Sequence, residues 1–255
     1  MTEKQILVKD LKINYKVFGE GKPFLILHGW RSKSQRWENV AELLINNNLQ
    51  VIIPDLPGFG ESQEPNQAWN LDGYVEWLKE FCDKVPELNN GFYLLGHSFG
   101  GSVAAKFSIK YNQNIKKLFL VAASCVRTVT FSKKALISLS RLFKVFYFLP
   151  FYESFRKYFY RFILRKSDYP YVSGIMKEIY LKVIEEDLSQ KLLFIKVLTT
   201  IIWGDKDDWT PIEYAHIINE KIPHSKLVII PGAGHNLHIN SPEILVEKVL
   251  ENLPS

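Results

Sequence analysis

The feature that most constrains the fold is a serine between two glycines, with an apolar run before it and a helix-like segment after it. The apolar run Phe92–Leu95 is typical of a buried strand and leads into the sequence G-H-S-F-G at 96–100. The next segment, Ser102–Tyr111, contains no Pro or Gly and has apolar residues at helical spacing. A strand that becomes a helix within about three residues leaves no room for side chains, and the glycines provide that room. The pattern predicts Ser98 at the apex of the turn. Glycine-rich turns between a strand and a helix also occur in α/β proteins in which the serine has no chemical role.

The length and composition of the chain are sufficient for one full hydrophobic core, or for such a core with a small appended domain. The chain has 255 residues, of which 47% are hydrophobic. Its start has no secretory pattern, and the apolar stretch 135–152 is interrupted by Arg141 and Lys144, so no membrane-spanning helix is expected. Two cysteines, Cys82 and Cys125, are too few for a disulfide framework. We therefore expect a cytoplasmic protein.

Residues 126–166 differ in composition from the rest of the chain. They contain ten Lys and Arg residues, a single acid, Glu153, and twelve aromatic residues. Since the whole chain carries a net charge of +5, the remainder is net acidic. This contrast indicates an insertion with a function of its own.

Strands and helices are expected to alternate along the chain. Expected strands lie at 5–8, 11–18, 23–27, 51–54, 92–95, 117–122, 198–203 and 227–230. Expected helices lie at 37–44, 71–85, 102–111, 212–221 and 242–253. The first two strands form a hairpin, and the alternation that follows predicts a mostly parallel sheet covered on both faces.

Five motifs in this order give the chain a family resemblance. They are His28-Gly29-Trp30, Asp55–Ser62, Gly96–Gly101, Trp203–Pro211 and Pro231–His235. Together they resemble the α/β-hydrolase fold family over essentially the whole chain. The resemblance implies an eight-stranded, mostly parallel sheet flanked by helices, with a helical cap inserted after the sixth strand. We expect the core domain to comprise residues 1–124 and 191–255, and the cap to comprise 125–190.

A serine hydroxyl becomes a nucleophile only with a base nearby. His235 is the predicted base, because it lies in a Gly-rich loop at the carboxyl end of the last strand, where catalytic side chains of such sheets converge. The other histidines are expected to bond locally to the backbone (His28 and His97), to flank the site (His238) or to face solvent (His216 and His224).

The base needs an acid that fixes its tautomer. The loop after the seventh strand offers Asp205, Asp207 and Asp208. The family pattern W-G-x-x-D-x-x-x-P selects Asp207, with Asp208 as the alternative, and Asp205 is expected to cap the turn. The resulting order of Ser, Asp and His is the one that the resemblance implies.

Two backbone amides are expected to form an oxyanion hole, those of Phe99 and Trp30. Side chains expected to line the substrate pocket are Trp30, His97, Phe155, Phe159 and Trp209. In the cap, Phe155, Phe159 and Phe162 form one helical stripe, and Lys157, Arg161 and Arg165 form another. The basic stripe has two interpretations, contact with an anionic membrane or substrate, and a solvated face.

The resemblance implies a serine hydrolase that cleaves a carboxylic ester of a small or lipid-like apolar substrate through an acyl-enzyme. It requires no metal or organic cofactor, and no nucleic-acid partner is expected. Two alternatives stay open: a carbon–carbon bond hydrolase with the same triad, and a ligand-binding member without catalysis. A serine nucleophile argues against the haloalkane dehalogenase and epoxide hydrolase branches. The sequence makes no prediction of the oligomeric state.

Overall fold

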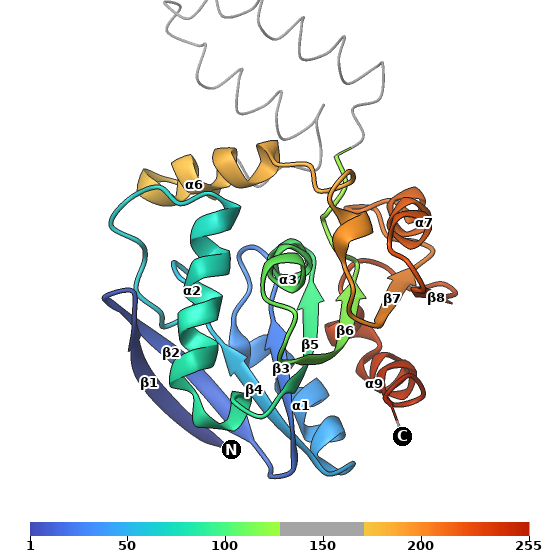
Figure 1. Ribbon diagram of the computed structural model, residues 1–255, viewed down its shortest axis with the longest axis horizontal. Helices are drawn as coiled ribbons and strands as arrows, with labels where there is room; N and C mark the ends of the chain where they lie inside the picture. Colours follow the sequence, from blue (N-terminus) through green and yellow to red (C-terminus); the bar gives the residue numbers. More distant parts are fainter. Residues whose placement is uncertain (128–170, 255) are drawn as a thin grey trace, which may run out of the picture.

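A computed structural model describes residues 1–127 and 171–254 of the chain (Figure 1). An eight-stranded sheet lies at its centre, in the order β1-β2-β4-β3-β5-β6-β7-β8. The strands are β1 (Thr2–Val8), β2 (Leu11–Phe18), β3 (Lys22–Leu27), β4 (Leu49–Pro54), β5 (Phe92–His97), β6 (Ile115–Val121), β7 (Thr199–Gly204) and β8 (Lys226–Ile230).

The sheet is antiparallel at one edge and parallel elsewhere. β1 pairs with β2, and β2 pairs with β4, in antiparallel registers, whereas every other pairing is parallel. The β1–β2 hairpin turns through Lys9 and Asp10, both with positive φ, which is the geometry that matches the twist of the two strands. The carboxyl ends of β3 to β8 therefore meet at one edge of the sheet.

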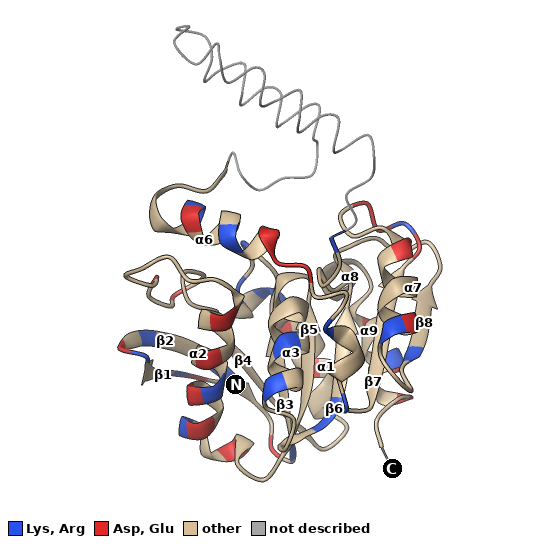
Figure 2. Cartoon of the chain, turned by 45° about the horizontal axis from the view of Figure 1, so that its top comes forward, with Lys and Arg blue, Asp and Glu red and all other residues tan. Residues whose placement is uncertain are grey.

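Helices cover both faces of the sheet. One buried cluster lies under α2 (Leu71–Lys84), α3 (Phe99–Lys110) and α7 (Ile212–Lys221). A second lies on the opposite face, under α1 (Glu38–Ile45), α8 (Leu237–Asn240) and α9 (Pro242–Leu250). Figure 2 shows that charged residues gather on the helices, whereas the central strand β5 carries none. The central strands are buried on both faces, as the near-continuous apolar runs predicted.

An insertion separates β6 from β7, and its described part contains α6 (Gly174–Glu185). Met176, Ile179 and Val183 of α6 join the buried cluster that contains α2 and α3. At the end of α6, Glu186 forms an ion pair with Lys106, which also pairs with Asp72 of α2. In Figure 1, α6 crosses the end of the sheet toward which β5 and β6 point. This part of the insertion is therefore held against the core.

The eight strands and the mostly parallel sheet are confirmed, with boundaries that shift by a few residues. The helix expected from Ser102 begins at Phe99, because the turn is completed in a single residue. The short helix α8 and a 3-10 turn at Ser34–Trp37 were not predicted. The division into core and cap stays a prediction, since residues 128–170 lie outside the described part. Among the described residues, the structure has no helix with the length and apolarity needed to cross a bilayer.

Candidate active site

Ser98 occupies a backbone conformation that non-glycine residues rarely adopt. Its φ is 52° and its ψ is −115°, a geometry that costs about 1–3 kcal/mol and persists only where the surroundings enforce it. They do so through backbone hydrogen bonds, three of which are 3.0 Å long. The Ser98 amide donates to the Val121 carbonyl, and the Ser98 carbonyl accepts from the amides of Gly101 and Ser124, each at 3.0 Å. The serine is therefore fixed between β5, β6 and α3.

Two glycines make this turn possible. A methyl group on Gly96 would collide with the Gly100 carbonyl, and one on Gly100 would collide with the carbonyls of Leu27 and His28. The first turn of α3 thus packs directly on the backbone of β3. This confirms the sequence-based reason for glycine at both positions.

The structure brings Ser98, His235 and Asp207 together from the carboxyl ends of three parallel strands, β5, β8 and β7. Ser98 Oγ lies 3.1 Å from His235 Nε2, and His235 Nδ1 lies 2.8 Å from Asp207 Oδ2. The carboxylate is fully buried, and the imidazole is 12% exposed. This geometry can pass a proton from the serine hydroxyl to an imidazole whose other nitrogen is held by an acid.

Both carboxylate oxygens of Asp207 accept hydrogen bonds from residues of its own loop. Its Oδ1 accepts the amides of Trp209 and Thr210, both at 2.8 Å, and its Oδ2 accepts the Thr210 hydroxyl at 2.7 Å. Burial by itself raises the pKa of this carboxyl, but the bond and charge of His235 and the two Thr210 donors outweigh it and lower the pKa below its usual value. Asp207 is therefore held as an anion.

The other two acids of this loop do not reach the histidine. Asp205 Oδ1 accepts the Gly232 amide at 2.6 Å and so joins the Asp207 loop to the loop that carries His235. Asp208 is exposed. Sequence reasoning missed Thr210, whose hydroxyl lies three residues after Asp207 and reaches its carboxylate.

His28 orients the peptide that would carry the second oxyanion donor. Its Nε2 accepts the Leu56 amide at 3.0 Å, so the ring proton lies on Nδ1, which donates to the Gly29 carbonyl at 2.8 Å. Burial lowers the pKa of His28, which keeps the ring neutral. Because peptide C=O and N–H groups point in opposite directions, holding the Gly29 carbonyl also fixes the direction of the Trp30 amide.

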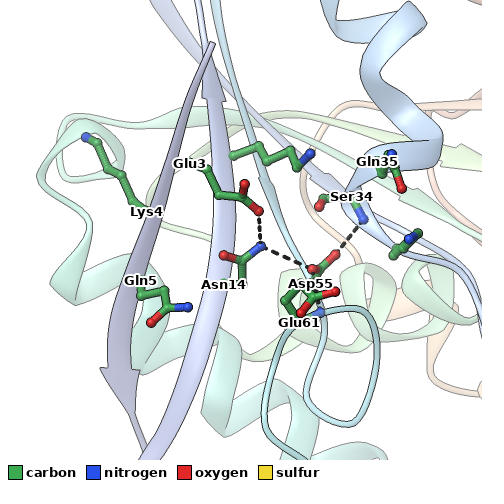
Figure 3. A pocket seen from close by; sticks show the side chains of 10 residues that line it. Glu3, Lys4, Gln5, Asn14, Ser34, Gln35, Asp55 and Glu61 are labelled. Atoms are coloured by element: carbon green, nitrogen blue, oxygen red, sulfur yellow. Dashed lines mark hydrogen bonds between the residues drawn. The ribbon is translucent and has the colours of Figure 1, made fainter.

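Asp55 holds the far end of the same loop. This residue is only 2% exposed, and its carboxylate accepts the Ser34 amide at 2.6 Å, the Glu61 amide at 3.0 Å and the Asn14 side-chain amide at 3.3 Å. Figure 3 shows these groups converging at the base of a polar cleft. The loop after β3 is therefore fastened at both ends, by His28 and by Asp55.

Aromatic side chains surround Trp30, the residue in the loop after β3 whose amide is expected to be the second oxyanion donor. The Trp30 ring lies 4.9 Å from Phe59, 5.2 Å from Phe99 and 5.3 Å from Tyr180 of α6, measured between centroids. Trp209 is 48% exposed, and its ring is 6.2 Å from that of His235. Of the other residues expected in the pocket, Phe155 and Phe159 lie outside the described part of the chain.

His97 is placed differently from our expectation for the pocket. It is buried behind His235, with its ring 5.7 Å from Trp37 and 4.7 Å from His238, so we do not keep it in the proposed pocket. His238 is also buried, stacked 4.3 Å from Trp37, and burial lowers its pKa to about 3. The local backbone contact expected for His28 is present, whereas the backbone partner of His97 is the carbonyl of His235, far away in the sequence. His216 and His224 are exposed as expected.

Comparison with known proteins identifies the family. A family described as alpha/beta hydrolase fold matches residues 22–152, just over half of the chain. Lipase 3 of Moraxella sp. strain TA144 is 27% identical over 246 residues, covering 84% of this chain and 72% of the lipase. An esterase from Exiguobacterium antarcticum has 25% identity and a TM-score of 0.76, over 98% of both chains. The chain belongs to the α/β-hydrolase fold family, and its distant homologues include lipases and esterases.

Thr210→Val should weaken the fold in a pH-dependent way. The valine removes a donor to the Asp207 carboxylate, so we expect a loss of about 1 kcal/mol in unfolding free energy near pH 7. A carboxyl with a lowered folded-state pKa stabilises the fold above its unfolded pKa of about 3.9, and this contribution is lost as the pH falls through the folded-state value. The difference from wild type should therefore shrink in acid. Urea unfolding at several pH values measures it, with Thr210→Ser as the control, and a pH-independent difference would contradict the account.

Proposed function

We propose that the protein is a serine hydrolase that cleaves carboxylic esters, with Ser98 as nucleophile, His235 as general base and Asp207 as the acid. The observation that carries the proposal is the continuous chain of contacts from Ser98 Oγ through His235 to Asp207, 3.1 Å and 2.8 Å long. The lipases and the esterase among the homologues support ester bonds as the target.

The proposed reaction has two acyl-transfer steps. Ser98 Oγ attacks the ester carbonyl carbon while His235 Nε2 takes the hydroxyl proton, and the alcohol leaves with that proton. Water, activated by the same imidazole, then cleaves the Ser98 ester and releases the acid. In both steps the developing oxyanion is stabilised by the amides of Phe99 and Trp30, each worth on the order of 10²–10³-fold in rate. The mechanism uses no metal or organic cofactor.

The proposed substrate has an apolar acyl group. The aromatic side chains of Trp30, Phe59, Phe99 and Tyr180 support this, because they lie together beside the proposed oxyanion donors. The cap, proposed as residues 125–190, would close the pocket, and the contact between Tyr180 and Trp30 joins its described part to the core. The basic stripe of the cap lies outside the described residues, and its contact with an anionic membrane stays a prediction.

Ser98→Ala should abolish reaction with a fluorophosphonate probe and hydrolysis of p-nitrophenyl esters. The alanine removes the only atom that forms the covalent bond. Ser102→Ala is the matched control: Ser102 is the next serine along α3, its hydroxyl donates to the Ser124 carbonyl at 2.8 Å, and its variant should label like wild type.

Mass spectrometry of the labelled protein and a series of ester chain lengths provide the measurements. An optimum at medium or long acyl chains supports the apolar pocket. A wild-type protein that does not label would contradict the proposal and favour a ligand-binding member of the family. Labelling without ester hydrolysis would favour the carbon–carbon bond hydrolase.

Asp207→Asn should lower kcat on the order of 10⁴-fold, because an amide no longer selects the tautomer of His235 or stabilises its cation. Asp208→Asn is the control from the same loop, and we expect its kcat to stay within about twofold of wild type, as for most exposed substitutions. Steady-state kinetics on one p-nitrophenyl ester compare the two. Equal losses, or a larger loss in Asp208→Asn, would show that Asp207 is not the acid.

A further inference from the structure

His97 fills the space where three loops of the candidate site meet. It is the last residue of β5, directly before Ser98, and only 3% of it is exposed. A methyl group on Gly29, in the loop after β3, would lie 3.0 Å from its Nδ1. Its ring centroid lies 4.9 Å from that of His235, in the loop after β8. One side chain thus touches the loops that carry the proposed nucleophile, oxyanion donor and base.

The ring makes one hydrogen bond, and its direction is determined by chemistry. His97 Nε2 lies 3.0 Å from the main-chain carbonyl oxygen of His235. A carbonyl only accepts, so Nε2 carries the ring proton and Nδ1 is left as an acceptor. Nδ1 is buried and has no hydrogen-bond partner within the described residues.

The surroundings of His97 keep it in this neutral form. Burial and the neighbouring His238, His235 and His28 lower its pKa well below the usual value. The Trp37 ring also packs against the His97 ring, with the two ring centroids 5.7 Å apart. His97 therefore presents a single fixed donor to a single carbonyl over the range in which a hydrolase of this kind would work.

We propose that His97 is a positioning residue, whose Nε2–H holds the carbonyl of His235 and thereby fixes the distance between His235 Nε2 and Ser98 Oγ. The inference rests on the proposed function. His97 and Ser98 are adjacent in the chain. The bond therefore couples the position of the turn that carries Ser98 to the position of the loop that carries His235. A misplacement of about 1 Å between reacting groups can cost on the order of 10²-fold in rate, so such a restraint has a measurable effect.

Two substitutions of His97 separate this role from simple packing. Glutamine places its amide nitrogen near the position of Nε2, within reach of the His235 carbonyl. Asparagine is one carbon shorter and places its amide near the position of Nδ1, facing Gly29. Both lose the ring contacts with Trp37 and His238, so both should lower the melting temperature to a similar extent.

We expect kcat on p-nitrophenyl acetate to fall about 10- to 100-fold in His97→Asn with little change in KM, and His97→Gln to recover most of that loss. Equal losses in the two variants would show a purely structural role and overturn the proposal. An unchanged kcat in His97→Asn would overturn it as well.

A second readout does not depend on turnover. The proton between His235 Nδ1 and Asp207 should give a low-field resonance in the proton NMR spectrum, and its shift reports the placement of the His235 ring. The resonance should be retained in wild type and His97→Gln, and be shifted or lost in His97→Asn. Identical spectra in all three would overturn the positioning role. A wild-type protein with this resonance but no reaction with fluorophosphonate would contradict the proposed function and leave the NMR comparison valid.

Discussion

The site depends on one backbone conformation, the positive φ of Ser98. This conformation is unfavourable by itself and is enforced by bonds from β6, from α3 and from the segment that follows β6. It places the serine side chain beyond the end of the parallel strands, within reach of His235. The amide of Phe99, the proposed oxyanion donor, follows directly in the chain. This turn requires glycine on both sides of Ser98. At Gly100, for example, the carbonyls of Leu27 and His28 occupy the space where a side chain would lie.

Around this turn, two buried histidines donate hydrogen bonds to main-chain carbonyls. His28 holds the carbonyl of Gly29, and His97 contacts the carbonyl of His235, while both rings are kept neutral by burial. A neutral imidazole is well suited to this task, because it offers one donor in a fixed direction without the cost of a buried charge. Buried side chains of the core thus hold these two loops of the candidate site. In the loop after β7, the Thr210 hydroxyl holds the Asp207 carboxylate, and Asp205 accepts the Gly232 amide of the neighbouring loop.

Much of this could be predicted from sequence, because the relevant signals are local. The strands are short apolar runs, and Ser98, Asp207 and His235 each lie in a compact motif next to a strand end. The contact of His97 with His235 joins residues 138 positions apart, and no local pattern reports it. The same holds for the stacking of His238 on Trp37 and for the packing of Tyr180 against Trp30. The boundary of α3 was missed because propensity disfavours the two glycines that its first turn contains.

The most direct test of the account is a crystal structure of the protein after reaction with a small alkyl phosphonate ester, whose tetrahedral phosphorus imitates the proposed intermediate. We expect a bond from phosphorus to Ser98 Oγ and a phosphonyl oxygen within hydrogen-bond distance of the amides of both Phe99 and Trp30. His235 should keep its present position, with Asp207 at its Nδ1. An adduct on another residue, or a phosphonyl oxygen directed away from both amides, would contradict the account.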